Sequence, residues 1–168
     1  MKKHQQKILT GLFILLAAAW LGRSHIRQLF PPAMKFAAAA LTGIDNNQKV
    51  TINDFKGSVV IVSCYQTWCI DCARETPELN QLATDINSEK FKVLYISDEP
   101  AEKQILFRKR FSSDKILFLE SAKTMAELGI HAYPTTFLLD KNGTVIKTTL
   151  EGYDWLKEIE TVRKLMAE

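Results

Sequence analysis

The sequence contains few of the residues from which a metal site or a nucleic-acid surface is built. Among 168 residues there are three cysteines and three histidines, and the formal net charge is only +3. Structural zinc needs about four such ligands, and two of the histidines, His4 and His25, flank an apolar N-terminal run. The densest basic run, from Arg108 to Arg110, is short. We therefore expect no nucleic-acid partner and no metal site.

Long apolar runs are also scarce, and the longest lies at the N-terminus. Residues 8–22 (ILTGLFILLAAAWLG) carry no charge and follow a basic start with Lys2, Lys3 and Lys7. A basic segment before an apolar run is typical of an export signal. The run is shorter than the roughly 18 residues of an ordinary spanning helix, but flanking basic side chains can lengthen a short span.

We expect residues 1–22 to be an uncleaved signal anchor, a single transmembrane helix. The alternative is a signal peptide cleaved after Ala19, which would release a secreted protein; large Trp20 and the apolar residues beyond it argue against cleavage. Because a basic N-terminus stays in the cytoplasm, everything after Arg23 is expected on the extracytoplasmic, periplasmic side of the cell membrane. No cysteine lies near the end of the run, which argues against a lipoprotein anchor.

Behind this segment the chain divides into a linker, residues 23–42, and one domain, residues 43–168. The linker contains Pro31-Pro32 and a run of alanines, which offer little to a core. In the domain, strands are predicted at 58–65, 91–97, 115–119, 135–139 and 144–149, and helices after the second cysteine, at 100–111, at 121–128 and at the C-terminus. Asn142-Gly143 predicts a hairpin. The order gives an α/β fold with a mixed central sheet flanked by helices.

Two of these helices have a face that is predicted to point inward. It holds Leu79, Leu82, Ala83 and Ile86 in the first helix, and Leu156, Ile159, Val162 and Met166 in the last. Tyr153 and Trp155 are interpreted as packing residues of the last helix without a functional role. Cys64, inside a β-branched run, is interpreted as a buried and inert thiol.

The chemistry concentrates in the sequence WCIDC, from Trp68 to Cys72. Cys69 follows a predicted buried strand and precedes a helix, where unpaired N–H groups and the helix dipole favour a thiolate. Cys72 comes one turn later on the same face, close enough to bridge Cys69. Such a pair can attack a disulfide through the first sulfur and release the substrate through the second. Half of a metal site is the alternative interpretation of this spacing.

Further motifs accompany the cysteine pair in one order along residues 40–166. They are TINDFKG before the strand, Trp68 before the first cysteine, Glu75 three residues after the second, Pro77 eight residues after the first, and YPTTFLLDKNG from Tyr133. Together they resemble the membrane-anchored, thioredoxin-like thiol–disulfide oxidoreductases of the TlpA/ResA type. The resemblance implies a thioredoxin-like fold and an enzyme whose own dithiol carries the two electrons, so that no cofactor is needed.

The resemblance also implies roles for individual residues. Cys69 would be the nucleophile and Cys72 the resolving thiol, while Glu75 matches a glutamate that lies near the cysteines of ResA-type members and tunes their titration. Pro134 would be cis and would pack against the disulfide, and Tyr133 would offer backbone groups to an extended substrate segment. Trp68 would shield one side of the site.

Two positions depart from related sequences. Asp71 stands before the second cysteine, where many family members have proline; a carboxylate there suits the helix dipole but repels a nearby thiolate. Ser63 stands six residues before the first cysteine, where soluble thioredoxins carry a buried aspartate. If proton transfer needs a carboxylate, Glu75 is the better candidate.

The resulting hypothesis is an extracytoplasmic protein-disulfide reductase. The resemblance implies that a membrane thiol carrier supplies its electrons and that protein disulfides, for instance apocytochrome c cysteines, receive them. The alternative is a metal-binding or copper-delivery module on the same fold, which would need a distant ligand, with His131 as the domain's candidate. Peroxidase activity is disfavoured because that chemistry usually presents a lone peroxidatic cysteine.

Overall fold

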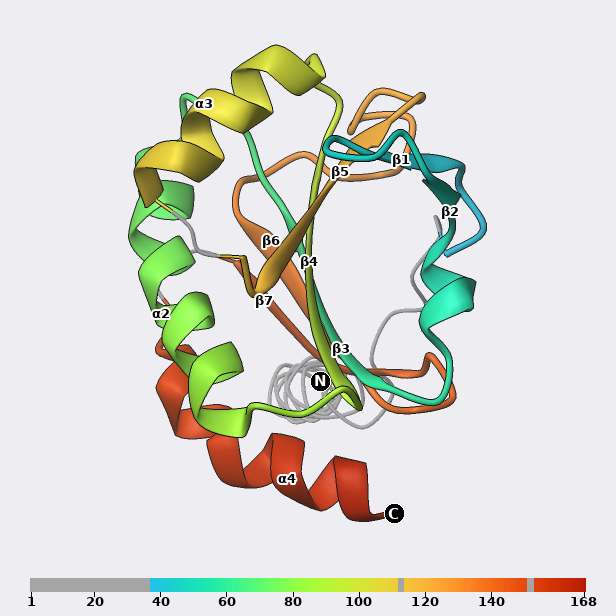
Figure 1. The fold of residues 1–168 in the computed structure, drawn as a ribbon, viewed down its shortest axis with the longest axis vertical. Coiled ribbons are helices and arrows are strands. Elements are labelled where there is room, and N and C mark those ends of the chain that lie inside the picture. The colour runs from blue at the N-terminus through green and yellow to red at the C-terminus, as the bar shows by residue number, and fades with distance from the viewer. Residues whose placement is uncertain (1–36, 112–113, 151–152) are drawn as a thin grey trace, which may run out of the picture. The chain divides into compact units, whose positions relative to one another are not determined.

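A computed structural model describes residues 37–111, 114–150 and 153–168 of the chain. The predicted anchor, residues 1–22, lies outside these ranges, as does most of the predicted linker. Within the described ranges, no helix is both long and apolar enough to cross a membrane. The strands found there form one sheet in the order β2-β1-β5-β4-β3-β6-β7 (Figure 1).

The sheet is mixed, as predicted. Its strands are β1 (Leu41–Gly43), β2 (Lys49–Val50), β3 (Val59–Cys64), β4 (Phe91–Ser97), β5 (Ile116–Ser121), β6 (Thr135–Leu139) and β7 (Val145–Leu150), and its helices are η1 (Ile52–Phe55), α2 (Ile70–Ile86), α3 (Ala101–Phe111), η2 (Trp155–Glu158) and α4 (Ile159–Ala167). Strands β3, β4 and β5 are parallel. At the two edges, β6 and β7, and β1 and β2, run antiparallel to their neighbours. The predicted α/β fold is therefore confirmed.

One face of the sheet is covered by α2, α3 and α4 (Figure 1). The connections β3–α2–β4 and β4–α3–β5 step the same way across the sheet, and right-handed crossovers then place both helices on the same face. All six residues of β3 are buried, as a strand covered on both sides requires. The shared core contains Leu79 and Leu82 of α2, Phe107 of α3 and Val162 of α4. This packing fixes the start of α2 against the end of β3.

The opposite face is covered by η1 and by the connection from β5 to β6. Here the predicted helix at 121–128 is wrong, because Ser121 belongs to β5 and only turns follow. Thr124 and Glu127 make the reciprocal bonds that usually begin a helix, but Gly129 adopts a positive φ of 81° and ends the turn. Met125, Leu128 and Ile130 each bury their side chains in the second core.

The first strand and the last helix also differ in detail from the predicted elements. Strand β1 begins at Leu41, two residues before the predicted domain start, and pairs with β5. Near the C-terminus a 3₁₀ turn, η2, precedes α4, and this changes which residues face inward. Leu156 is therefore 41% exposed instead of buried, while Trp155 is completely buried. The structural reason is the tighter 3₁₀ turn, which rotates the residues before α4 relative to an α-helical pattern.

Candidate active site at the start of α2

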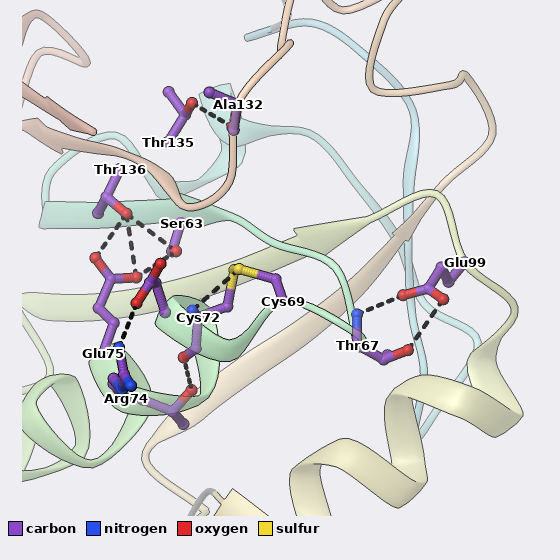
Figure 2. The surroundings of a disulfide bond; sticks show 12 residues. Ser63, Thr67, Cys69, Cys72, Arg74, Glu75, Glu99, Ala132, Thr135 and Thr136 are labelled. Atoms are coloured by element: carbon purple, nitrogen blue, oxygen red, sulfur yellow. Dashed lines mark hydrogen bonds and ion pairs between the residues drawn. A yellow bond between two sulfur atoms is a disulfide. The ribbon is translucent and has the colours of Figure 1, made fainter. Parts of the chain in front are cut away.

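The loop between β3 and α2 carries the first cysteine and is fastened to the chain segment after β4. The side-chain amide of Gln66 donates a hydrogen bond to Asp98 Oδ1 at 2.6 Å. The backbone N–H and the hydroxyl of Thr67 both donate to the Glu99 carboxylate, at 2.5 and 3.0 Å (Figure 2). Hydrogen bonds to a charged group are the stronger kind, so they hold the loop just before Cys69 in place.

The Asp98 carboxylate holds two segments at once. Its first oxygen accepts from Gln66, and its second oxygen accepts the Met125 N–H at 2.8 Å. Its contribution to stability can therefore be tested by substitution. In Asp98→Asn an NH₂ group replaces one of the two carboxylate oxygens, and this NH₂ group then faces an N–H donor instead of accepting from it. We expect the free energy of unfolding to fall by about 1–3 kcal/mol, measured by urea denaturation. Glu102→Gln, an exposed acid at the start of α3, is the matched control and should change it by less than about 0.5 kcal/mol. Equal losses in both variants would contradict this role of Asp98.

Cys69 and Cys72 form a disulfide at the N-terminus of α2, as the spacing predicted. Cys69 is the N-cap residue, and its sulfur accepts a hydrogen bond from the Cys72 N–H at 3.1 Å (Figure 2). In the reduced protein the same N–H and the helix N-terminus favour a thiolate on Cys69. Cys69 keeps 7% of its surface exposed, whereas Cys72 is completely buried. Cys69 is thus the sulfur that a partner can reach.

Glu75 lies one helical turn beyond Cys72 and is buried, with only 6% of its surface exposed. Its Oε2 accepts a hydrogen bond from the Ser63 hydroxyl of β3 at 2.8 Å. Its Oε1 accepts from the Thr136 hydroxyl of β6 at 2.9 Å and from the Trp155 indole N–H of η2 at 2.8 Å. Figure 2 shows the carboxyl group between Ser63 and Thr136, on the side of α2 that faces the sheet. Glu75 is therefore a buried acid held by donors from three elements.

The environment of Glu75 changes its acidity. Burial raises the pKa of Glu75 above the usual glutamate value, the nearby charge of Glu78 raises it too, and the hydrogen bonds from Ser63, Trp155 and Thr136 oppose the rise. Glu75 also lines a surface hollow of about 210 Å³, together with Asp71, Arg74, Glu78, Tyr153 and Asp154. A buried acid with a raised pKa beside a disulfide can exchange protons with a thiol.

An apolar surface surrounds the reachable sulfur. The Tyr133–Pro134 peptide bond is cis, as predicted. Trp68 is 71% exposed, and its ring meets that of Tyr133 edge to face with 5.8 Å between centroids. Ile70, 65% exposed, follows Cys69 directly. These residues form a surface next to the cysteines on which an extended substrate segment could lie.

Three comparisons with known proteins agree with this site. The AhpC/TSA family model matches residues 32–148, more than half of the chain. The chain belongs to the AhpC/TSA family. It is 26% identical to the thiol-disulfide oxidoreductase ResA of Geobacillus thermodenitrificans, over 97% of this chain and 99% of that protein. It is also 29% identical to the thioredoxin-like protein YneN of Bacillus subtilis, over 76% of this chain and 74% of that protein.

Among solved structures, the chain is similar to the thioredoxin domain of a thiol-disulfide oxidoreductase from Bacteroides vulgatus. The TM-score is 0.63 at 26% identity, and the match covers 77% of this chain and 97% of that one. The predicted thioredoxin-like fold and the resemblance to ResA-type proteins are confirmed. So is the expectation of a thiol–disulfide oxidoreductase.

In this AhpC/TSA family member, sequence analysis missed part of the environment of Glu75. The sequence identifies Ser63 only as a departure from thioredoxins and predicts that Trp155 packs without a functional role. Trp155 does pack, but its indole N–H also bonds Glu75, which lies 80 residues earlier in the chain. A signal was present in Ser63, a hydroxyl inside an otherwise apolar buried strand, since a buried polar group requires a partner.

The remaining residues singled out in the sequence lie at the edge of the site. Asp71 forms an ion pair with Arg74 at 2.8 Å, which offsets its repulsion of a thiolate. Cys64 is a free, fully buried thiol, and burial followed by the nearby charge of Glu75 raises its pKa well above the ordinary value. His131 is exposed in the connection before β6. In the described part of the chain no three His, Cys, Asp or Glu residues are grouped to hold a metal ion.

Proposed function

We propose that this protein reduces disulfide bonds of other proteins outside the cytoplasm, with Cys69 as the nucleophile and Cys72 as the resolving thiol. The observation that carries the proposal is the pairing of a reachable Cys69 with a fully buried Cys72 at a helix N-terminus. The exposed rings of Trp68 and the neighbouring Tyr133 supply an apolar surface for an unfolded or extended substrate. The compartment follows from the export signal in residues 1–22.

The reaction consumes one dithiol for each substrate disulfide. The Cys69 thiolate attacks one sulfur of the substrate, the substrate disulfide breaks, and the leaving thiolate takes up a proton. Cys72 then loses its proton and attacks the Cys69 sulfur. The mixed disulfide breaks, the second substrate thiolate leaves and is protonated, and the Cys69–Cys72 disulfide remains. Two electrons have passed from the enzyme to the substrate.

The second attack requires a proton acceptor, because Cys72 is buried away from water. Glu75 follows Cys72 by three positions on α2, and residues at this spacing lie on the same side of a helix. Its carboxylate is the acidic group of the site that the fold buries together with Cys72. We assign Glu75 the role of proton acceptor for Cys72.

The supply of electrons and the location complete the proposal. The oxidised pair must be reduced again from inside the cell, and a membrane thiol carrier is the donor that the resemblance to ResA-type proteins implies. Apocytochrome c cysteines are the substrates implied in the same way. Residues 1–22 would hold the domain at the membrane. Labelling of intact cells with a membrane-impermeant maleimide tests the location: modification of reduced Cys69 supports the outer side, and protection contradicts it.

The direction of electron flow is tested by the reduction potential of the Cys69–Cys72 pair. A reductant should equilibrate in a dithiothreitol buffer near the potential of thioredoxin, about −270 mV. A potential near that of DsbA, about −120 mV, would identify an oxidant and contradict the proposed direction. Cys64→Ser, which removes only the buried free thiol, should give the same potential as the unchanged chain.

A further inference from the structure

The indole of Trp155 is the least expected contact of Glu75. The side chain is completely buried, and its Nε1 lies 2.8 Å from Glu75 Oε1. The backbone N–H of Trp155 also lies 3.4 Å from Glu78 Oε2. The side chain and the backbone of one residue in η2 therefore bond two acids that are one turn apart on α2. Its ring is supported by Tyr153, with 5.1 Å between ring centroids.

The three donors to Glu75 differ in what they can do when a proton arrives. The hydroxyl groups of Ser63 and Thr136 can either donate or accept a hydrogen bond, whereas an indole N–H can only donate. An acid that carries its proton on a given oxygen needs an acceptor facing that oxygen. Oε1 accepts from two donors, the Trp155 N–H and the Thr136 hydroxyl, and a protonated carboxyl oxygen is a weaker acceptor than a carbonyl oxygen, so a proton on Oε1 would weaken the contact with the indole. Oε2 faces the Ser63 hydroxyl, which can turn to accept.

The two hydroxyl groups are close enough to reorient together. The Thr136 oxygen lies 3.0 Å from the Ser63 oxygen and 2.9 Å from Glu75 Oε1. With Glu75 ionised, Ser63 donates to Oε2, and Thr136 and Trp155 donate to Oε1. With the proton on Oε2, the carboxyl donates to Ser63, Ser63 donates to Thr136, and Thr136 and Trp155 still donate to Oε1. In both states each carboxyl oxygen therefore keeps its hydrogen-bond partners, and the Ser63–Thr136 hydrogen bond is added when the proton enters at Oε2.

We propose that Trp155 is a positioning residue for the redox reaction: its indole N–H keeps Glu75 Oε1 an acceptor, directs the Cys72 proton to Oε2 and favours the ionised acid that receives it. This inference rests on the proposed role of Glu75 as proton acceptor. Other titratable or charged groups near Glu75 are Cys72 and Glu78 on α2, Cys64 on β3, Tyr95 on β4, and Asp71, Arg74, Tyr153 and Asp154 around the hollow.

Trp155→Phe tests the proposal because it keeps an aromatic ring and removes the N–H donor. The measured quantity is the rate at which a preformed mixed disulfide on Cys69 is resolved by Cys72, followed against pH in the full-length chain. The midpoint of the Glu75-dependent rise should move about one to two pH units upward, since a hydrogen bond to a charged group favours the ionised form by that order. An unchanged midpoint in a folded variant overturns the proposal.

The double variant with Glu75→Gln separates positioning from structural damage. With the acid gone, Trp155→Phe should add no further shift to the pH profile, because the two residues act on the same proton. An equal shift with and without Glu75 shows a structural effect and overturns the proposal. If Glu75→Gln alone leaves the profile unchanged, the proposed role of Glu75 itself fails; if it changes the profile and Trp155→Phe does not, only the role of Trp155 fails.

The unchanged protein provides a direct measurement, in which variants serve only for assignment and as a control. The chain has three tryptophans. The ¹⁵N-indole resonance that disappears in Trp155→Phe belongs to Trp155. This resonance should titrate with Glu75 in the reduced protein and should stop titrating in Glu75→Gln. A Trp155 resonance that does not change with pH overturns the proposal.

Discussion

Replacing Cys72 by serine should stop the reaction at a covalent complex between the enzyme and its substrate. Cys69 remains the reachable sulfur at the N-terminus of α2 and still attacks the substrate disulfide, but the group that would release it is gone. We expect a one-to-one adduct on a non-reducing gel, confirmed by intact mass, and turnover reduced to the uncatalysed background. Cys69→Ser should lose turnover to the same extent and form no adduct.

The third cysteine supplies the control for this result. Cys64 is fully buried, and burial raises its pKa, which leaves it a poor nucleophile. Cys64→Ser should therefore keep full turnover, and the adduct of Cys72→Ser should persist when Cys64 is also replaced. An adduct that requires Cys64, or one that forms on Cys72 in the Cys69→Ser variant, would contradict the assigned order of attack.

Replacing Glu75 by glutamine should slow the resolution of the mixed disulfide by roughly 100-fold or more at neutral pH, the lower range of a lost general base. Burial raises the pKa of Glu75, so in the unchanged enzyme the acid accepts a proton only above that raised pKa. The resolution rate should therefore rise through the pKa of Glu75, while the variant should follow only the ionisation of its thiols. Stopped-flow measurement with a preformed mixed disulfide gives both profiles.

The same substitution has a consequence for stability whose sign follows from linkage. A glutamate with a raised pKa in the folded state retains a proton that the unfolded chain has already lost. Its contribution to stability is complete below the unfolded pKa and is lost as the pH rises through the folded pKa. The free energy of unfolding of the unchanged protein, relative to Glu75→Gln, should thus decrease across this window. A difference that is constant with pH would contradict a raised pKa.

The sequence predicts those structural features whose residues are close together along the chain. The β-branched run of β3, the bridge from Cys69 to Cys72 and the turn at Asn142-Gly143 are all local, and the cis Pro134 followed from a resemblance in a continuous motif. These features were confirmed because short spacing or a single motif determines them.

The environment of Glu75 could not be predicted in the same way. It joins Ser63 of β3, Thr136 of β6 and Trp155 of η2, which are far apart in the sequence and meet only in the folded domain. The prediction of a helix at 121–128 was wrong for a related reason. Its local helix signals are present, but the positive φ of Gly129 ends the turn, and the apolar side chains of the segment pack into the second core.

The chain around the start of β6 contributes to two features of the site within a few residues: the surface beside the cysteines and the hydrogen bonds of Glu75. Just before β6, Tyr133 and Pro134 border the surface beside the cysteines, and two positions after Pro134 the side chain of Thr136 reaches Glu75. Thr135 between them closes the preceding turn through a hydrogen bond to the Ala132 carbonyl at 2.7 Å (Figure 2). Substrate choice and proton affinity therefore share one short stretch of backbone. We therefore expect a sequence change that shifts this stretch to affect both the proposed substrate surface and the hydrogen bond to Glu75.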